Sequence, residues 1–438
     1  MITQSFLGRL ALGAALVTGS AAVASAQDSG PLLDALVRKG ILTDQEAEDL
    51  RADLSRDYAA NNVNATPAGR STTRMQITGR LQTQYAGLDT DYSAGADASH
   101  VNHFLIRRAL VGVRGEFGPA WAGQMVYDFA ASRFDTAFLQ WRDVPGITVD
   151  VGVRKVNLGY EERTSSGQIK TIERSAVTRY FIEADSLTGA TRRRLGAGAQ
   201  RVGIFYDHVL GEAKTGEVQA FYGAALTNPE RATDIGSSTS AGTSATNDVA
   251  LWFNGGLREK VSADTNWTAG FGMGYIPGLG RQTLPLGSDD LFVGTVYGEF
   301  TSGRFTLLGE VLGSKAENGA DALAANNDSA SWGFLVQPSF MLTEKFEVVS
   351  RYSYLDTDGR GVTAANGAIR SSPDRATGSV PFDVMHEGYL GATYYFLGHD
   401  LKLSAGLVYG KLQDPLTGTN DSLEAEVTGV RSQLQVQF

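Results

Sequence analysis

Apolar and polar residues alternate with a period of two along most of the chain, from Arg74 to the last residue. In residues 265–275, Trp267, Phe271 and Tyr275 share one parity, while asparagine, threonine and glycine take the other. Alternate residues of a strand lie on the same face, so this pattern predicts strands with one apolar and one polar face. In a soluble sandwich the apolar face forms the core, whereas in an outer-membrane barrel it meets lipid and the polar face lines a lumen.

The spacing of the strands discriminates between these two folds. Sixteen strands are predicted, at 74–86, 102–117, 120–130, 134–142, 147–155, 199–207, 216–226, 247–258, 265–275, 290–301, 304–314, 331–341, 345–354, 386–397, 400–410 and 427–438. Tight links such as 118–119 and 342–344 alternate with long polar ones such as 156–198 and 355–385, apart from the short link at 131–133. Short turns at one rim and long loops at the other are typical of transmembrane barrels. We therefore expect an all-β fold, a 16-stranded antiparallel transmembrane barrel over 74–438, with both barrel ends on the tight-turn side.

The residues before the barrel predict export. Residues 1–26 combine a mildly basic start, an apolar run and the A-x-A pattern of Ala24-Ser25-Ala26, as in a secretory signal peptide. The alternative is a membrane anchor, but the apolar run at 10–23 is shorter than the roughly 20 residues that a spanning helix needs. Residues 27–59 hold a capping box, Thr43 with Glu46, and are predicted to form a short periplasmic helix, followed by a linker at 60–73.

Composition excludes several classes of protein. The chain has no Cys, which excludes disulfides and thiolate metal sites, and its net charge of −10 argues against a nucleic-acid partner. Only His100 and His103 lie close together among the five histidines, so no metal is expected. Neither a G-x-S-x-G nor a Walker A run is present, and we expect neither an enzyme nor a cofactor.

Basic residues are concentrated in one part of this acidic chain. Fifteen lysines and arginines face ten acidic residues between positions 101 and 204. A barrel of sixteen strands leaves an aqueous channel, and an arginine on the lipid face would cost about 2–4 kcal/mol, so these side chains should point inward. Strand parity predicts this for six arginines, Arg80, Arg108, Arg114, Arg142, Arg154 and Arg431. Arg107 has the opposite parity, so it faces the lumen only if a β-bulge intervenes, and otherwise snorkels at the rim.

The longest connection, 156–198, is expected to fold into the barrel. Its middle carries apolar and aromatic residues that a disordered loop does not need, and burying them against the wall would narrow the lumen. Lys170, Arg174 and Arg179 would then lie near the path. Two interpretations of the basic residues stay open: a path for anions, for which guanidinium groups supply paired donors, or simple solvation of a wet pore wall.

One stretch resembles a known family. The run at 152–166, with Lys155 and Thr164-Ser165-Ser166, followed by Glu173-Arg174-Ser175, is similar to the G-x-x-K-x-P-F-x-x-E-x-x-T-S-S … E-R-S pattern of the phosphate-selective porins O and P. The strand with Arg107-Arg108 and the helical leader at 32–43 also resemble that family.

The resemblance implies a homotrimer of 16-stranded barrels, with arginines that descend to a lysine-lined constriction. By motif it would implicate Arg107, Arg108, Lys155 and Arg174. The sequence departs from the pattern at Asn157-Leu158, where the family has Pro-Phe, and at Arg154, where an aromatic residue is usual.

These observations together predict an outer-membrane porin for small anions such as phosphate or pyrophosphate, with outer-membrane lipid, the solutes and two further copies as its partners. A weakly selective general porin is the first alternative, in which acidic loops and later strands balance the arginines. A structural barrel tethered to the envelope by the periplasmic helix is the second.

Overall fold

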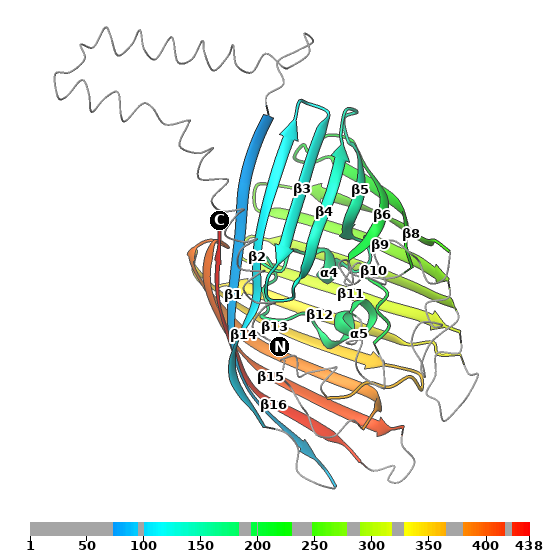
Figure 1. The fold of residues 1–438 in the computed structure, drawn as a ribbon. Helices are drawn as coiled ribbons and strands as arrows, with labels where there is room; N and C mark the ends of the chain where they lie inside the picture. Colours follow the sequence, from blue (N-terminus) through cyan, green and yellow to red (C-terminus); the bar gives the residue numbers. More distant parts are fainter. Residues whose placement is uncertain are drawn as a thin grey trace, which may run out of the picture. The chain divides into compact units, whose positions relative to one another are not determined.

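The chain forms a closed barrel of antiparallel strands (Figure 1). The computed structural model describes residues 73–94, 100–183, 194–198, 200–229, 248–277, 290–317, 328–364, 380–416 and 423–438. The predicted signal peptide, periplasmic helix and all but the last residue of the linker lie outside these residues. No helix among the described residues has the length and apolar character to cross a bilayer.

The sixteen predicted strands are all present. They are β1 (Thr73–Tyr92), β2 (His100–Phe117), β3 (Trp121–Asp128), β4 (Arg133–Trp141), β5 (Ile147–Lys155), β6 (Gln200–Leu210), β7 (Val218–Thr227), β8 (Ala250–Lys260), β9 (Thr265–Pro277), β10 (Asp290–Ser302), β11 (Phe305–Ala316), β12 (Trp332–Met341), β13 (Phe346–Asp356), β14 (Phe382–Leu397), β15 (Leu401–Pro415) and β16 (Ala425–Gln437). Two short helices, α4 (Tyr160–Arg163) and α5 (Ala176–Ile182), lie in the connection from β5 to β6. The prediction of an all-β, 16-stranded antiparallel barrel is therefore confirmed.

Each strand pairs with its neighbours in sequence, and β1 closes the barrel against β16. The closing register runs from Arg80 opposite Gln437 to Tyr92 opposite Ala425. Tight turns at one rim use glycines in the left-handed region, such as Gly303 with φ 56° and Gly398 with φ 56°. A residue with a side chain would be strained at these two positions.

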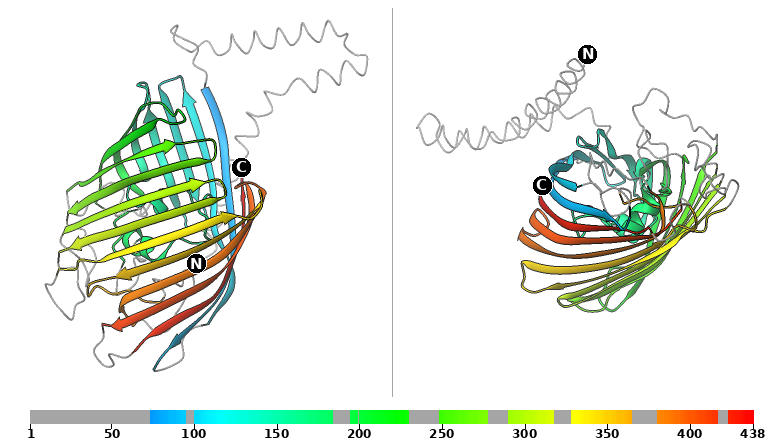
Figure 2. Two further views of the ribbon diagram at one scale, coloured as in Figure 1. Left: turned by 180° about the vertical axis from the view of Figure 1, so that it is seen from behind. Right: turned by 90° about the horizontal axis from the view of Figure 1, so that it is seen from below.

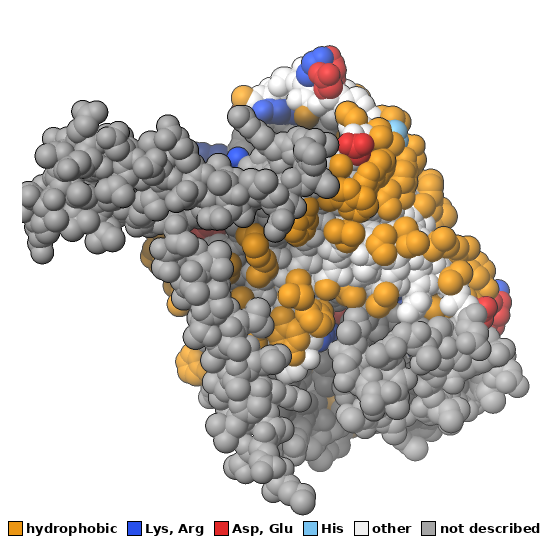
Figure 3. Space-filling view, turned by 45° about the horizontal axis from the view of Figure 1, so that its top comes forward, with side chains coloured by type: hydrophobic (Ala, Val, Ile, Leu, Met, Phe, Trp, Pro, Cys, Tyr) orange, Lys and Arg blue, Asp and Glu red, His pale blue; other side chains and the backbone are white. Residues whose placement is uncertain are grey.

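The barrel wall has an apolar outer face and a polar inner face. On β15, Leu403 is 45% exposed and Leu407 is 57% exposed. Lys402 and Ser404, which flank Leu403 in the sequence, are buried. Figure 3 shows one face of the barrel, on which hydrophobic side chains spread over the strands and few charged ones interrupt them. A soluble sandwich would bury this apolar face, so the arrangement is that of a barrel in lipid.

Near the long-loop rim this arrangement is reversed. The side chains of Ala86 and Leu88 on β1 point inward and are fully buried, whereas their neighbour Asp89 is exposed. The reversal explains why β1 ends at Tyr92 and not near residue 86, where the expected apolar parity stops. The inner face is apolar there because the β5–β6 loop fills the barrel at that level.

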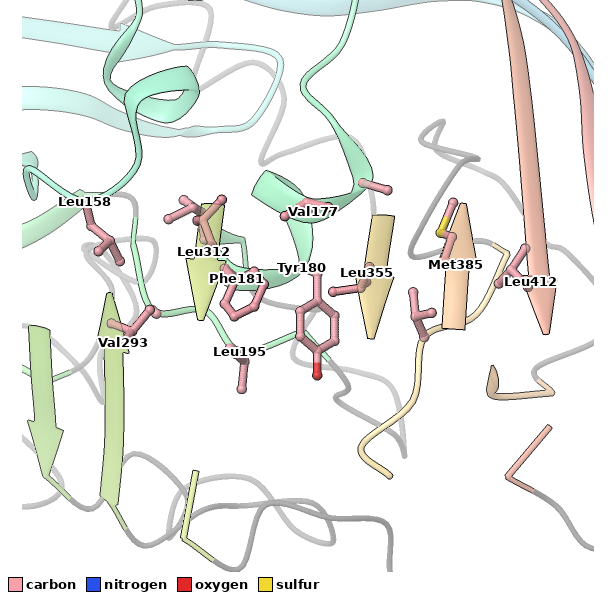
Figure 4. Close-up of a cluster of buried hydrophobic side chains, with 14 of the residues drawn as sticks. Leu158, Val177, Tyr180, Phe181, Leu195, Val293, Leu312, Leu355, Met385 and Leu412 are labelled. Atoms are coloured by element: carbon pink, nitrogen blue, oxygen red, sulfur yellow. The ribbon is translucent and has the colours of Figure 1, made fainter. Parts of the chain in front are cut away.

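The loop from β5 to β6 packs inside the barrel (Figure 2). All seven residues of α5 are buried, and the helix contacts β11, β12 and β13. Figure 4 shows Val177, Tyr180 and Phe181 among Leu312 and Leu355 of the wall. This apolar cluster fixes the loop to one side of the lumen, and the polar parts of the loop form the site described next.

Candidate functional site

A β-bulge in β2 directs two consecutive arginines into the lumen. In the register of β1 with β2, Gln82 lies opposite Arg108 and Thr83 opposite Ile106, which leaves Arg107 unpaired as the extra residue. Arg108 Nη1 donates to Gln82 Oε1 at 2.7 Å, and Arg107 Nε lies 2.7 Å from Glu173 Oε1 of the loop. Arg107 therefore faces the lumen. Without a bulge it was expected to snorkel at the rim.

Arg80 of β1 is clamped by the tip of the loop. Its guanidinium donates to Ser166 Oγ at 2.8 Å, to Ser165 Oγ at 3.0 Å and to Gln437 Oε1 at 3.1 Å. A Cβ on Gly167 would lie 2.6 Å from Gln437 Oε1 and 2.8 Å from Arg80 Cζ, so a larger residue at this position would displace these two side chains. The serines of the T-S-S run thus attach the loop to the seam where β1 meets β16.

Glu162 of α4 joins two predicted cations. Lys155 Nζ lies 2.9 Å from Glu162 Oε1, and Arg174 Nε lies 2.9 Å from Glu162 Oε2. Arg174 also donates to the backbone oxygens of Glu161, Glu162 and Thr164. Burial alone would raise the pKa of the Glu162 carboxyl, but Arg174 and Lys155 outweigh burial and lower this pKa below its ordinary value. The carboxylate therefore stays ionised at neutral pH.

Carboxylates on the opposite wall hold the other side of the loop. Glu310 of β11 accepts hydrogen bonds from the backbone N–H groups of Tyr160 at 2.7 Å and Glu161 at 3.0 Å, at the N-terminus of α4. Lys170 Nζ lies 2.6 Å from Glu347 Oε1 of β13. Acidic residues of the later strands therefore bind the loop.

A buried ion-pair network anchors the loop near its centre. Arg351 of β13 lies 2.9 Å from Glu161 of α4 and 3.3 Å from Glu387 of β14. Glu387 also accepts the backbone N–H of Ala176 at the start of α5. None of these three charged side chains is more than 6% exposed, so the network lies out of contact with water.

The predicted anion-binding residues divide into two groups. Seven of the eleven pair with a carboxylate: Arg107 with Glu173, Arg142 with Glu116, Arg154 with Asp150 and Asp207, Lys155 and Arg174 with Glu162, Lys170 with Glu347, and Arg179 with Glu183. The other four are Arg80, which donates to Ser165, Ser166 and Gln437, Arg108, which donates to Gln82, Arg114, which is exposed on the inner face of β2, and Arg431, which is 3% exposed. The structure thus does not bring all eleven together at one site.

Several site residues were not singled out by sequence reasoning. Glu162, Ser165 and Ser166 belong to the motif that resembles the family, but the sequence analysis assigned them no role. Their position between basic residues could have indicated that this carboxylate and these hydroxyl groups bind the neighbouring cations. Glu310 and Arg351 gave no local signal, since their partners lie far along the chain. Among the described residues no group of three or more His, Asp or Glu side chains is arranged to hold a metal ion.

Part of the chain matches a known protein family. Residues 75–214 match the family model of phosphate-selective porin O and P, which confirms the resemblance for that part of the chain. No curated protein sequence matches. The matched part covers β1 to β6 and the whole β5–β6 loop.

Solved structures of similar fold are outer-membrane channels. The outer membrane channel DcaP of Acinetobacter baumannii has a TM-score of 0.50 at 12% identity, covering 85% of this chain and 100% of DcaP. An anion-selective porin from Comamonas acidovorans has a TM-score of 0.50 at 12% identity, covering 84% and 100%. Salmonella typhi OmpF, in complex with daunomycin, has a TM-score of 0.50 at 11% identity, covering 85% and 99%. The chain therefore has the fold of an outer-membrane porin, and its residues 75–214 match the phosphate-selective porins O and P.

Proposed function

We propose that the protein is an outer-membrane porin through which small anions, such as phosphate or pyrophosphate, diffuse passively. The passage runs through the part of the lumen that the β5–β6 loop leaves open. The name of the matched family and the anion-selective porin of the same fold agree with this proposal. A channel, rather than an enzyme, fits both comparisons.

A row of arginines on β1 and β2 carries the proposal. Arg108 and Arg114 lie on the inner face of β2, and Arg80 lies between their levels, opposite Leu110. Because a strand rises about 3.4 Å per residue, the row extends roughly 20 Å along the lumen. The serine and glutamine acceptors of Arg80 are neutral, and the Arg114 side chain is exposed on the inner face. Guanidinium groups in such a row offer paired donors to phosphate and carboxylate oxygens.

The seven carboxylate-paired cations favour a second candidate, a weakly selective general porin. A paired lysine or arginine adds little net field to the lumen, because its partner cancels most of its charge. If the carboxylates along the passage also balance the row on β1 and β2, the pore passes ions of both signs.

We further propose that the barrel assembles as a homotrimer in the outer membrane and that residues 27–59 lie in the periplasm. The trimer follows from the family resemblance, and the periplasmic position follows from the even number of strands, which brings the two barrel ends to the tight-turn rim. The outer face of apolar side chains supports the lipid surroundings. The structural-tether alternative depends on residues 27–59, which lie outside the described residues.

Phosphate titration of chloride conductance tests the anion path. Arg114→Gln removes one exposed charge from the row, and Arg304→Gln removes the same charge from an exposed tight turn outside the lumen. The proposal expects phosphate to block chloride current saturably in the wild type and in R304Q, and more weakly in R114Q. Equal block in all three proteins, or none in the wild type, would favour the weakly selective pore.

A further inference from the structure

The two departures from the family pattern, Arg154 and Asn157, meet at one cluster on the inner wall. Arg154 of β5 pairs with Asp150 of its own strand and, at 2.8 Å, with Asp207 of β6. Its guanidinium also stacks over the ring of Phe205, 4.8 Å from the ring centre. Arg154 thus holds the Asp207 carboxylate in one place on the wall.

Asn157 uses that carboxylate as an acceptor. Its Nδ2 donates to Asp207 Oδ1 at 2.7 Å and to Asn254 Oδ1 of β8 at 3.1 Å. Its Oδ1 accepts from Arg154 Nη2 at 3.3 Å. A proline at this position, as in the family pattern, has no side-chain amide and makes none of these bonds.

The next residues keep the loop against the wall. The Asn157 carbonyl oxygen would lie 2.7 Å from a Cβ on Gly272 of β9, so the backbone approaches that strand as closely as glycine allows. Leu158 is fully buried, and Gly159 adopts a φ of 80° immediately before α4. The root of the loop, residues 156–159, therefore follows the wall from β5 toward Glu310 of β11, where α4 is capped.

The cluster borders water. Asp207 is 28% exposed and Arg154 16% exposed at their side chains, in contrast to the buried anchor around Arg351. A loop root that moved away from the wall here would move into the water-filled part of the lumen.

We propose that Asn157 and Asp207 pin the root of the loop to the wall and thereby set the width of the passage, with Arg154 as the residue that positions Asp207. The proposal rests on the proposed function only in that the barrel conducts solutes, and it does not depend on the sign of the ions. It gives the replacement of Pro by Asn and the unusual Arg154 one shared role in this chain.

Two variants of Asp207 separate its hydrogen bond with Asn157 from its negative charge. Asp207→Asn keeps an oxygen that accepts from Asn157 Nδ2 but removes the charge, whereas Asp207→Ala removes both. Asn157→Ala removes the same hydrogen bond by deleting its donor. Losing these hydrogen bonds shifts the balance between held and released roots by about tenfold or more. Asn266→Ala, on the polar face of β9 and with an exposed side chain, is the matched control.

The measurement is the size of polyethylene glycol that still enters the channel, together with open-channel current noise, in planar bilayers. Resistance of the folded band to SDS at room temperature verifies that each barrel folds. We expect D207A and N157A to exclude polymers that the wild type admits, with noisier current, because the released root enters the lumen, and we expect D207N and N266A to match the wild type. Wild-type polymer cutoffs in D207A and N157A would overturn the proposal, and so would a D207N cutoff equal to that of D207A, because charge alone would then act.

The zero-current potential of the same channels keeps this proposal separate from the anion path. A channel without anion preference whose polymer cutoff still falls in D207A would refute the anion path and leave the proposal on Asn157 and Asp207 standing. An anion-selective channel whose cutoff does not respond would do the reverse. If N157A does not fold, the comparison of D207A with D207N decides the question alone.

Discussion

Glu162→Gln is the perturbation that separates the structural and electrostatic roles of the lumen charges most clearly. The carboxylate lies 2.9 Å from both Lys155 Nζ and Arg174 Nε, and its side chain is 6% exposed. Glutamine has nearly the same shape but no charge, so the buried Arg174 and the partly exposed Lys155 lose their counter-ion. Breaking a buried pair by removing one partner costs about 3–5 kcal/mol.

The same change should strengthen anion preference. One negative charge leaves the lumen, and the positive charges of Lys155 and Arg174 are no longer cancelled by it. Glu299→Gln is the matched control, because Glu299 also lies in the lumen but accepts a hydrogen bond from the Tyr160 hydroxyl, at 3.0 Å, and pairs with no cation in the described residues. We expect E162Q to shift the zero-current potential further toward anions than E299Q, and to unfold at a lower temperature in heat-modifiability assays.

The pH dependence of this loss has a defined sign. The pKa of the Glu162 carboxyl is lowered in the folded protein, because Arg174 and Lys155 outweigh the effect of burial. The stabilisation is therefore fully present above the unfolded-state pKa of about 4.3 and is lost as the pH falls through the lower folded value. The stability gap between wild type and E162Q should be constant from neutral pH down to about 5 and should narrow in stronger acid. Equal stability and equal potentials for wild type and E162Q at neutral pH would refute the assigned role of Glu162.

Three further predictions concern the packing of the loop and the wall. Gly167→Ala should loosen the clamp on Arg80, because the added Cβ would lie 2.8 Å from Cζ, and limited proteolysis should cut the loop faster than in Gly309→Ala, where a Cβ meets open space. Arg351→Met should lower the unfolding temperature, since it leaves two buried glutamates unpaired at a cost of about 3–5 kcal/mol; an unchanged temperature would argue against a central anchor. Leu407→Lys should destabilise the barrel in lipid vesicles by about 2–4 kcal/mol if its exposed face meets the bilayer core, and by little if it meets water.

The strands could be predicted from sequence because their pattern is local. A period of two marks a wall with one face in lipid and one in water, and β5 was predicted at its observed bounds, Ile147–Lys155. The predicted strands were too short at ends where the apolar residues face inward and not outward. Phe382 and Met385 of β14 are buried inward against the loop, and the strand therefore begins before residue 386.

The candidate site was only partly accessible from sequence. Parity assigned Arg80 and Arg108 to the lumen, but it could not show the bulge at Arg107 or the pairing of Arg107 with Glu173, which lies 66 positions away. The pairing of Lys155 and Arg174 with one carboxylate also requires the folded loop. Counting basic residues therefore overstated the positive charge along the path, because each carboxylate that anchors the loop neutralises part of it.

The zero-current potential of the purified wild-type protein in a planar bilayer, under a potassium chloride gradient, tests the central claim most directly. The account predicts a potential of the sign that chloride permeation gives, because we propose that the arginine row on β1 and β2 lines the passage. A potential near zero or of the potassium sign would contradict it and would leave a general diffusion pore.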